Sequence, residues 1–518
     1  MPVVGPPLAS ITLPNHLLDA GLRADPNDVA LESMVQAWTW RQLDETVNRL
    51  AQALLELGLA PGDRVASLMP NRIVLLVHYM ACLRAGLVVV PLNYRYLAFH
   101  IDHALDVSGA SLLVAHGERA KDLLACKRID QLALPVVWFE SSPDPIAPRL
   151  EDLCEGPTVQ RALPEPAPTD PCSIFFTSGS TGQPKGVTHT HASLAAMMAA
   201  VVQSMELVPE DIVLPGSSIS HLGGFLFSFT ALSIGARAAV ARSLASVDMI
   251  PLLRKTRPTV MTMLPTALLQ LIGERSLIPQ DLASLRLVRG SADKIPAELE
   301  RRFTEITGFP INEGYGMTEV GMATLSPLSG EVRCGSVGRP LPGFSMSVRD
   351  AQGNELGAGC EGVLWMRSPT MTSGYWARPD ASAAAIHDGW LNSGDLVLVD
   401  ADGFLWFRGR KKQIIVHDGS NICPQEVEEA LLEHPGVANA GVVGVHDTLH
   451  GENVWAFITL DGSLSGPIDE AHLIRFARRR IGYKAPEHIF FIDEMPLNPT
   501  GKIDRMVLKR WALEHHDA

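Results

Sequence analysis

The sequence is poor in several features that would assign it to familiar protein classes. Only seven of its 518 residues are cysteines, and no two of them have the C-x-x-C spacing. Scattered cysteines in odd number are typical of reduced thiols, so we expect neither a disulfide framework nor a zinc site. The formal net charge is -14 and no basic stripe stands out against it, which argues against a nucleic-acid partner.

The sequence also predicts neither a signal peptide nor a membrane-spanning helix. The stretch MPVVGPPLASITLP at the start lacks the basic residues and the continuous apolar core of a signal peptide. The most apolar long region, residues 73–90, is interrupted by His78 and Arg84, so it does not predict a bilayer span. We therefore expect a cytoplasmic protein without stable membrane insertion.

Apolar segments in the first part of the chain alternate between two periods. Residues 40–58 carry Leu and Val at steps of three and four, which is typical of an amphipathic helix. Apolar strands are predicted at 64–69 and 87–92, with a helix near 73–84 between them. Strands that alternate with helices indicate a mostly parallel sheet covered on both faces.

The chain is too long for one hydrophobic core and divides near a charged junction. After Gly-Arg-Lys-Lys at 409–412 the pattern restarts as helix, two strands, helix and strand, over a length typical of a small domain. We predict an N-terminal domain at residues 1–410 and a C-terminal α+β domain at residues 411–518.

The stretch FFTSGSTGQPKGVTHTH, residues 175–191, lies between an expected buried strand and an expected helix. Glycines let backbone amides turn toward a ligand, and the hydroxyl groups and Lys185 suit phosphate oxygens. The stretch predicts a polyphosphate-binding loop, although an isolated loop of this composition is more often an ordinary surface loop. It is not a Walker A loop, because Gly186 rather than Ser or Thr follows the lysine.

Three later segments carry groups that a nucleotide site requires. In NEGYGMTEVG, Thr318 is suited to a phosphate oxygen and Glu319 to Mg²⁺. Asp395 in SGD is suited to two ribose hydroxyls, and Lys502 in PLNPTGK lies on a loop bounded by Pro and Gly. Taken singly, each segment also fits a structural role, as a turn, a cap or a solvated lysine.

Taken in order, these segments resemble the adenylate-forming superfamily, which contains acyl- and aryl-CoA synthetases, firefly luciferase and the adenylation domains of peptide synthetases. The resemblance extends from about Leu31 to Leu508, and YGMTE, SGD, GRKK, NICPQEVE and NPTGK follow the phosphate-binding signature in family order. It implies an α/β fold: a large N-terminal domain of two layered αβ subdomains plus a distorted β-barrel, and a small mobile α+β C-terminal domain.

The resemblance also implies a reaction in two halves. A carboxylate attacks the α-phosphate of Mg·ATP to give an acyl-adenylate and pyrophosphate, and an acceptor then takes the acyl group while AMP leaves. Thr318 would contact the α-phosphate, Glu319 would bind the metal, and Lys502 would bridge the substrate carboxylate and the α-phosphate in the first half only. Lys412 falls at the family's hinge, about which the small domain would rotate.

The remaining nucleotide contacts are implied by matching positions. The phosphate-binding loop would supply Thr177, Ser178, Gly179, Ser180, Thr181, Gly182 and Lys185. The base and ribose would be held by a second set, with Tyr315 near the adenine: Gly290, Ser291, Ala292, Glu313, Gly314, Tyr315, Gly316, Asp395 and Arg410.

The stretch SSISHLGGFLF, residues 217–227, is implied to form the acyl pocket. His221 matches a gating histidine at the acceptor tunnel, although a lone His beside apolar residues is usually only packed. No basic residue lies in this stretch, so we expect a mainly apolar pocket for an aryl, cyclic or medium-chain acid. The predicted pocket residues are His221, Gly224, Phe225, Gly316 and Met317.

The identity of the acceptor depends on two departures from the family pattern. Gln413 replaces an Asp, and Asp418 replaces the first residue of a Gly-Gly pair, whereas Gly419 keeps the second, where pantetheine passes. We expect coenzyme A as cosubstrate. The alternative is an amide-forming, coronafacate ligase-like enzyme that transfers the acyl group to an amino acid. A carrier protein also stays open as the acceptor. A regulator without catalysis is disfavoured by Glu319 and Lys502, and the sequence leaves monomer and homodimer both open.

Overall fold

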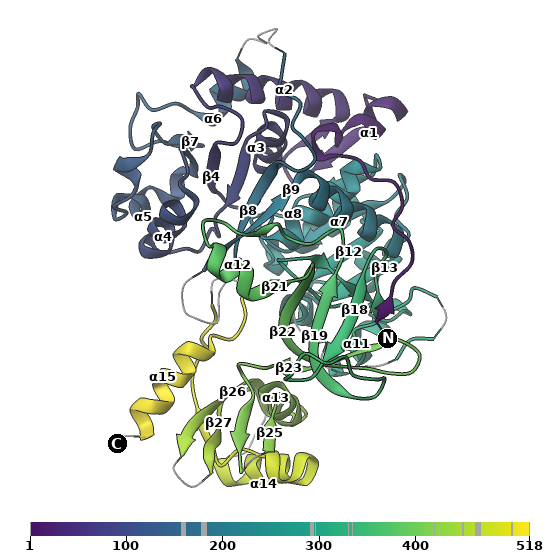
Figure 1. Cartoon of the computed structure of the whole chain (residues 1–518). Helices are drawn as coiled ribbons and strands as arrows, with labels where there is room; N and C mark the ends of the chain where they lie inside the picture. Colours follow the sequence, from purple (N-terminus) through teal and green to yellow (C-terminus); the bar gives the residue numbers. More distant parts are fainter. Residues whose placement is uncertain are drawn as a thin grey trace. The chain divides into compact units, whose positions relative to one another are not determined.

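The computed structural model of the chain describes most of the sequence (Figure 1). The described residues are 2–156, 162–177, 184–290, 295, 297–329, 331–333, 335–418, 420–447, 450–461, 468–498 and 501–516. The chain divides into two compact units. The larger unit comprises Met1–Ser347, Trp365–Asn392 and Asp400–Leu405, and the smaller comprises Val348–Leu364, Ser393–Val399 and Trp406–Ala518.

A seven-stranded sheet with the order β20-β9-β8-β5-β4-β6-β7 forms the first layer of the larger unit. Its strands are β4 (Arg64–Leu68), β5 (Val88–Pro91), β6 (Leu112–His116), β7 (Val137–Phe139), β8 (Pro171–Thr177), β9 (Lys185–Thr190) and β20 (Gly374–Tyr375). The five strands from β7 to β8 pair in parallel, whereas β9 and β20 are antiparallel to their neighbours. The predicted parallel sheet is confirmed, with an antiparallel edge that carries the candidate site.

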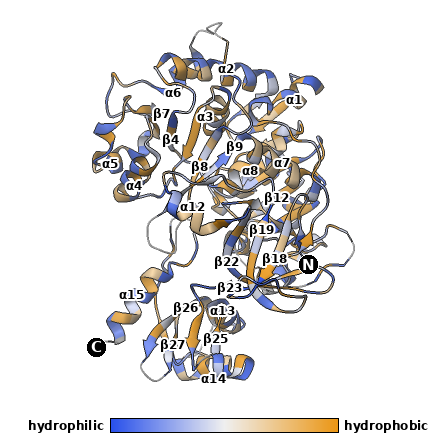
Figure 2. Cartoon of the chain, viewed as in Figure 1, coloured by the Kyte–Doolittle hydropathy of each residue, from blue (hydrophilic) through white to orange (hydrophobic). Residues whose placement is uncertain are grey.

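Helices cover this sheet as the periodicity predicts. They include α2 (Trp40–Glu56), α3 (Ile73–Arg84), α4 (Ala98–Ser108), α5 (Ala120–Leu124) and α6 (Leu150–Glu155). Helix α2 begins at Thr39, whose hydroxyl accepts from the Gln42 amide at 3.2 Å while the Gln42 side chain accepts from the Thr39 amide at 2.9 Å. Hydrophilic and hydrophobic residues alternate along α2, whereas α3 is apolar and almost fully buried (Figure 2).

The second sheet of the larger unit has the order β13-β12-β10-β11-β2-β3. Its strands are β2 (Val29–Glu32), β3 (Ala37–Thr39), β10 (Ile212–Gly216), β11 (Arg237–Ala239), β12 (Val260–Met263) and β13 (Leu287–Gly290). Nearby helices are α1 (Asp19–Ala24), α7 (His191–Ser204), α8 (Leu222–Ser233), α9 (Ser246–Thr256), α10 (Pro265–Gly273) and α11 (Ala297–Thr307). Ligands in such sheets bind beyond the carboxyl ends of parallel strands, where β10 and β13 lead into predicted site residues.

Short strands and a third sheet complete the architecture. Two small hairpin-like pairs are β14 (Gly316–Met317) with β15 (Gly321–Met322), and β16 (Thr324–Leu325) with β17 (Arg339–Pro340). A six-stranded sheet contributes strand segments to both units: β1 (Val3–Val4), β18 (Ser345–Arg349), β19 (Glu361–Arg367), β21 (Ile386–His387), β22 (Trp390–Val399) and β23 (Leu405–Arg410). Helix α12 (Pro379–Ala385) precedes β21.

The smaller unit is built on a five-stranded sheet with a hydrophobic core on each face. Its strands are β24 (Ile415–His417), β25 (Ser420–Ile422), β26 (Val437–Asp447), β27 (Gly451–Leu460) and β28 (His488–Phe491), and its helices are α13 (Pro424–Leu432), α14 (Glu470–Ile481) and α15 (Arg505–His516). Val442 and Ala456 belong to one core and the next residues, Val443 and Phe457, to the other. Neighbouring residues enter different cores because side chains on a strand point alternately to its two faces. The predicted mixed α/β fold is confirmed.

Two further expectations concern the domain boundary and membrane-spanning helices. The domain boundary between residues 410 and 411 stays a prediction. In the part of the chain that the structure describes, no helix has both the length and the apolarity needed to cross a membrane.

The segment after the phosphate-binding loop differs from the expectation. We predicted a loop between a strand and a helix, but residues 185–190 form β9, so the loop closes a β-hairpin before α7 begins at His191. The prediction was wrong here because the six-residue strand KGVTHT is short and its β-branched residues are mixed with polar ones.

Candidate active site

The hairpin of β8 and β9 positions both ends of the predicted phosphate-binding loop. Thr177 is the last residue of β8 and lies directly opposite Lys185, the first residue of β9. The predicted contacts Ser178, Gly179, Ser180, Thr181 and Gly182 lie outside the described residues. The pairing of β8 with β9 therefore fixes Thr177 and Lys185 at the two ends of the predicted loop.

Tyr375 links Lys185 to Glu319, the predicted metal ligand. β20 pairs with β9, and the Lys185 Nζ lies 4.8 Å from the centre of the Tyr375 ring. The Tyr375 hydroxyl donates a hydrogen bond to Glu319 Oε1 at 2.9 Å. A cation over an aromatic face is an attractive arrangement, so the tyrosine contacts the lysine through its ring and the carboxylate through its hydroxyl group.

Burial determines the protonation states in this group. Glu319 is only 6% exposed. Burial and the neighbouring Glu319 carboxylate raise the pKa of the Tyr375 phenol above its usual range, so the hydroxyl stays protonated and remains a donor at neutral pH. The second oxygen of Glu319 is a hard oxygen ligand of the kind that Mg²⁺ prefers.

His189 ties the Thr318–Glu319 segment to the same strand. Its Nε2 lies 2.7 Å from the Thr318 carbonyl oxygen. Burial lowers the pKa of His189 to about 4, so the ring is neutral and the Nε2 hydrogen donates to that carbonyl. On the other side of the segment, the Thr372 amide donates to the Glu319 carbonyl at 2.7 Å.

Sequence reasoning missed both Tyr375 and His189 as site residues. His189 lies within the loop signature that we singled out, and its place two residues before a helix is the one signal in the sequence. Tyr375 is almost two hundred residues from Lys185, and only the pairing of β20 with β9 brings it there.

The predicted base-binding segments are adjacent in the larger unit. The Gly290 amide donates to the Asn312 carbonyl at 3.1 Å, and the Tyr315 amide donates to Thr324 Oγ1 at 3.0 Å. A Cβ on Gly314 would stand 2.5 Å from the Thr324 carbonyl oxygen, so only glycine fits there. Tyr315 is buried. Ser291 and Ala292 lie outside the described residues.

The other predicted residues of the base-binding segment lie next to Asn312 and Tyr315 in the chain. Glu313 follows Asn312, and Gly316 and Met317 form β14, which pairs with β15. A Cβ on Gly316 would stand 2.4 Å from the Gly321 carbonyl oxygen. The close approach of the two strands therefore fixes the position from which Thr318 and Glu319 follow.

His221 occupies the N-cap position of α8, at the carboxyl end of β10. Its Nε2 is 3.1 Å from Asn93 Nδ2. The Asn93 Oδ1 accepts from the Arg95 amide at 2.9 Å, and this contact orients the side-chain amide so that Nδ2 donates to the histidine. The imidazole Nε2 is therefore an acceptor. Gly224 permits a close helix–loop contact, because a Cβ there would stand 2.4 Å from the Ser218 carbonyl oxygen.

Phe225 and Phe227 face different surroundings on α8. Phe225 is fully buried, with ring centres at 5.3 Å from Phe175 and 4.1 Å from Phe229. Phe227 lies beside Arg289, whose guanidinium carbon is 5.7 Å from the ring centre. The structure thus places Phe225 in the aromatic core, and its predicted role in the pocket stays a prediction.

Arg289 is a buried cation that the sequence analysis did not single out as a site residue. It is 4% exposed, and its Nε has no hydrogen-bond partner among the described residues. Burial lowers the pKa of Arg289 to about 10, which leaves the guanidinium charged at neutral pH. A buried donor without a partner is costly, so the Nε of this arginine is suited to an anionic or oxygen-bearing ligand.

The predicted ribose pair lies in the smaller unit. Arg410 Nε is 3.5 Å from Asp395 Oδ1, and the Asp395 residue is 5% exposed whereas the arginine is largely exposed. The Asp395 amide donates to Ser393 Oγ at 3.1 Å. The carboxylate is thus held in place while the guanidinium remains accessible.

Lys412 and Lys502 both lie on turns of the smaller unit. Lys412 lies two residues after Arg410, whose carbonyl accepts from the amides of Gln413 and Ile414 at 2.8 and 3.1 Å. The Lys502 amide donates to Asn498 Oδ1 at 3.1 Å, and the Asn498 amide donates back to the Lys502 carbonyl at 2.7 Å. Gly419 lies outside the described residues. Joint action of these lysines with Glu319 stays a prediction.

Comparison with known proteins identifies the class. The family model of the AMP-binding enzyme matches residues 18–376, and that of the AMP-binding enzyme C-terminal domain matches residues 426–502. The chain therefore belongs to the AMP-binding enzyme family, as an acyl-CoA synthetase-like member of the adenylate-forming superfamily. The predicted resemblance is confirmed.

Relatives and solved structures cover almost the whole chain. A feruloyl-CoA synthase of an Amycolatopsis species is 32% identical over 495 residues, which is 94% of this chain and 96% of that protein. The structure is similar to ATP-bound MatB from Rhodopseudomonas palustris, with a TM-score of 0.88, 27% identity, and 96% and 99% of the two chains covered. It is also similar to the amide bond synthetase McbA from Marinactinospora thermotolerans, with a TM-score of 0.84, 28% identity, and 96% and 99% covered.

The Tyr375–Glu319 hydrogen bond is testable with Tyr375→Phe, which keeps the ring beside Lys185 and removes only the hydroxyl. Loss of a donor to a charged group costs about 1.5–3 kcal/mol. We expect pyrophosphate exchange to fall about tenfold or more, with more Mg²⁺ needed for half-maximal rate. The matched control is Tyr94→Phe, which removes a phenol–carboxylate bond to Glu118 elsewhere in the larger unit. Equal rates for the two variants would refute the role of Tyr375.

Proposed function

We propose that the enzyme activates a carboxylic acid with Mg·ATP to give acyl-AMP and pyrophosphate, then transfers the acyl group to coenzyme A and releases AMP. The observation that carries the proposal is the group of Lys185, Tyr375 and Glu319 beside the phosphate-binding hairpin. Membership of the AMP-binding family and the similarity to a feruloyl-CoA synthase support it.

The first half-reaction brings two anions together, so cations and hydrogen bonds must offset their charge. Lys185 would contact the β- and γ-phosphates, Thr318 the α-phosphate, and Lys502 the substrate carboxylate together with the α-phosphate. Glu319 would hold Mg²⁺, which would offset the negative charge of the phosphates. Tyr315 would lie near the adenine, and Asp395 with Arg410 would fix the ribose.

We assign the second half-reaction to coenzyme A, with the C-terminal domain at residues 411–518 rotating about Lys412 between the halves. The second candidate is amide formation with an amino acid, favoured by the similarity to McbA and by the carboxylate of Asp418. Asp418 could attract an ammonium group, whereas beside anionic coenzyme A its charge is unfavourable. The cytoplasm is the proposed compartment, supported by described cysteines that are all free thiols.

The acid is proposed to be largely apolar with one oxygen-bearing substituent. The apolar part follows from the stretch around His221 and Gly224, which contains no basic residue. The oxygen-bearing substituent follows from Arg289 of β13. Its guanidinium lies beside Phe227, which is on α8 with Gly224, and its Nε and Nη2 are 3.3 Å from the Cβ position of Gly314. The Arg289 Nε, which has no hydrogen-bond partner among the described residues, would donate to such an oxygen.

The acceptor is tested by product analysis. The purified enzyme is incubated with ATP, Mg²⁺ and a panel of aryl and medium-chain acids, with coenzyme A in one arm and a mixture of amino acids in the other. Mass spectrometry is expected to find acyl-CoA and AMP in the first arm and no amide in the second. Amide without thioester would promote the second candidate, and absence of pyrophosphate release with every acid would overturn acid activation.

Lys502 is tested by separating the half-reactions. Lys502→Ala is expected to slow acyl-adenylate formation by more than about 100-fold while a supplied acyl-adenylate is consumed at near the wild-type rate. The two halves have separate transition states, so one residue can act in one alone. The control is Lys509→Ala, an exposed lysine of the smaller unit. Equal losses in both halves would contradict the assignment.

Arg289 is tested with pairs of aryl acids that differ only by a distal hydroxyl or carboxyl group. The wild type is expected to favour the oxygen-bearing acid in kcat/KM by about tenfold, corresponding to about 1.4 kcal/mol. Arg289→Met, which keeps the length without the charge, should abolish that preference and leave the KM for ATP unchanged. A changed KM for ATP with an intact acid preference would place the arginine at the nucleotide instead.

A further inference from the structure

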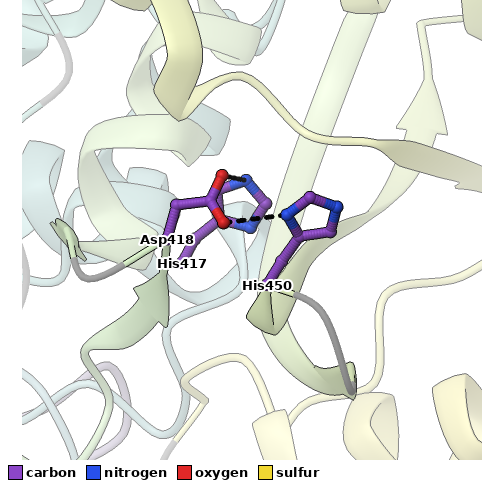
Figure 3. A group of neighbouring side chains, drawn as sticks. All are labelled: His417, Asp418 and His450. Carbon is purple, nitrogen blue, oxygen red and sulfur yellow. Dashed lines mark hydrogen bonds and ion pairs between the residues drawn. The ribbon is translucent and has the colours of Figure 1, made fainter.

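Two histidines and an aspartate gather at one end of the sheet in the smaller unit (Figure 3). His417 is the last residue of β24, Asp418 follows it, and His450 immediately precedes β27. Asp418 Oδ1 is 2.8 Å from His450 Nδ1, and Asp418 Oδ2 is 3.7 Å from His417 Nε2. One ligand atom from each of the three residues lies within 4.8 Å of the other two.

The orientation of His417 directs its Nε2 at two carboxylates. His417 Nδ1 is 2.7 Å from the carbonyl oxygen of Glu452, and a carbonyl can only accept, so Nδ1 carries the hydrogen. The other ring nitrogen, Nε2, faces Asp418 Oδ2 at 3.7 Å and Glu487 Oε1 at 3.5 Å. Two carboxylates beside one imidazole nitrogen concentrate negative charge at a point that a bound cation would neutralise. Histidine metal ligands are typically fixed in this way, by a carbonyl on the other ring nitrogen.

The backbone around Asp418 holds the group together. Asp418 has a φ of 47°, in the left-handed region that a side chain seldom adopts. Its amide donates to the His450 carbonyl at 2.9 Å, which closes β24 onto the start of β27. Glu487 is fixed as well, because its Oε2 accepts from the Val454 amide at 2.5 Å, leaving Oε1 toward His417.

We propose that His417, Asp418 and His450 bind a divalent transition-metal ion of the Zn²⁺ type. Two imidazole nitrogens and a carboxylate oxygen are a common ligand set for such ions. Ligand atoms about 2.0–2.1 Å from a tetrahedral ion stand about 3.4 Å apart. His450 Nδ1 is 2.8 Å from Asp418 Oδ1 and His417 Nε2 is 3.7 Å from Asp418 Oδ2, so each imidazole lies near that spacing from a different oxygen of the same carboxylate. Glu487 Oε1 or water completes the coordination.

The proposed site differs from the expectation drawn from the cysteines. The absence of zinc was inferred from cysteine spacing, but a His–Asp–His site has no short motif here, since 32 residues separate Asp418 from His450. The site does not depend on the proposed catalytic function. A metal on Asp418 would also neutralise the charge that makes this position unusual beside Gly419.

Metal content and affinity test the proposal on the full chain. After treatment with chelator and dialysis against buffer with Zn²⁺, elemental analysis should find one ion per chain, and calorimetric titration should give the same stoichiometry. Substitution with Co²⁺ should produce visible absorption bands of a low-symmetry, tetrahedral-type complex. Such bands report the coordination shell itself and do not depend on enzymatic activity.

Variants identify the ligands. His450→Ala should weaken Zn²⁺ binding by more than about 100-fold, beyond the 10–100-fold cost of losing an outer-shell partner. Asp418→Asn, which keeps the shape, should weaken it as well, and it serves if His450→Ala fails to fold. The matched control, His472→Ala, removes an exposed histidine whose Nε2 lies 3.1 Å from His434 in the same unit. It should bind Zn²⁺ as the wild type does.

Two outcomes would overturn the proposal. One is the absence of stoichiometric Zn²⁺ and Co²⁺ binding in the wild type, which would leave the group as an ion pair between Asp418 and a protonated His450. The other is equal affinity in His450→Ala, Asp418→Asn and the wild type, which would place any bound metal elsewhere.

Discussion

The antiparallel pairing of β9 with β8 on one side and β20 on the other is the constraint on which the candidate active site depends. It places Lys185 opposite Thr177 and brings Tyr375 under the lysine. The same strand carries His189, which binds the Thr318 carbonyl. Because side chains alternate along a strand, a slip of one residue would turn the lysine and histidine to the other face and separate them from Glu319.

Burial has different chemical consequences for the polar groups in the larger unit. It keeps His189 neutral, so the imidazole acts as a fixed donor and not as a charge. It keeps Tyr375 protonated, so the phenol can donate to Glu319. Arg289 stays charged although its pKa is lowered, because the ordinary value of an arginine lies far above neutrality. The same desolvation thus leaves a neutral imidazole, a protonated phenol and a charged guanidinium.

Several elements were predictable from local sequence because local contacts decide them. The periodic apolar residues and the Thr39–Gln42 capping box specify α2, and short continuous apolar runs specify the buried centres of β26 and β27. β9 was missed, since a six-residue strand between a glycine-rich loop and a helix carries too little pattern. Ser178, Ser291, Gly419 and the other loop positions outside the described residues stay predictions.

The sequence by itself determined the class of chemistry, because a phosphate-binding loop and its companion segments need particular residue types at consecutive positions. It also determined the family, through the order of those segments. Only the tertiary structure decided that Tyr375 meets Glu319, that Arg289 lies beside Phe227, and that His450 meets Asp418. These pairs are far apart in the chain, and their contacts depend on strand order and register, which no local pattern specifies.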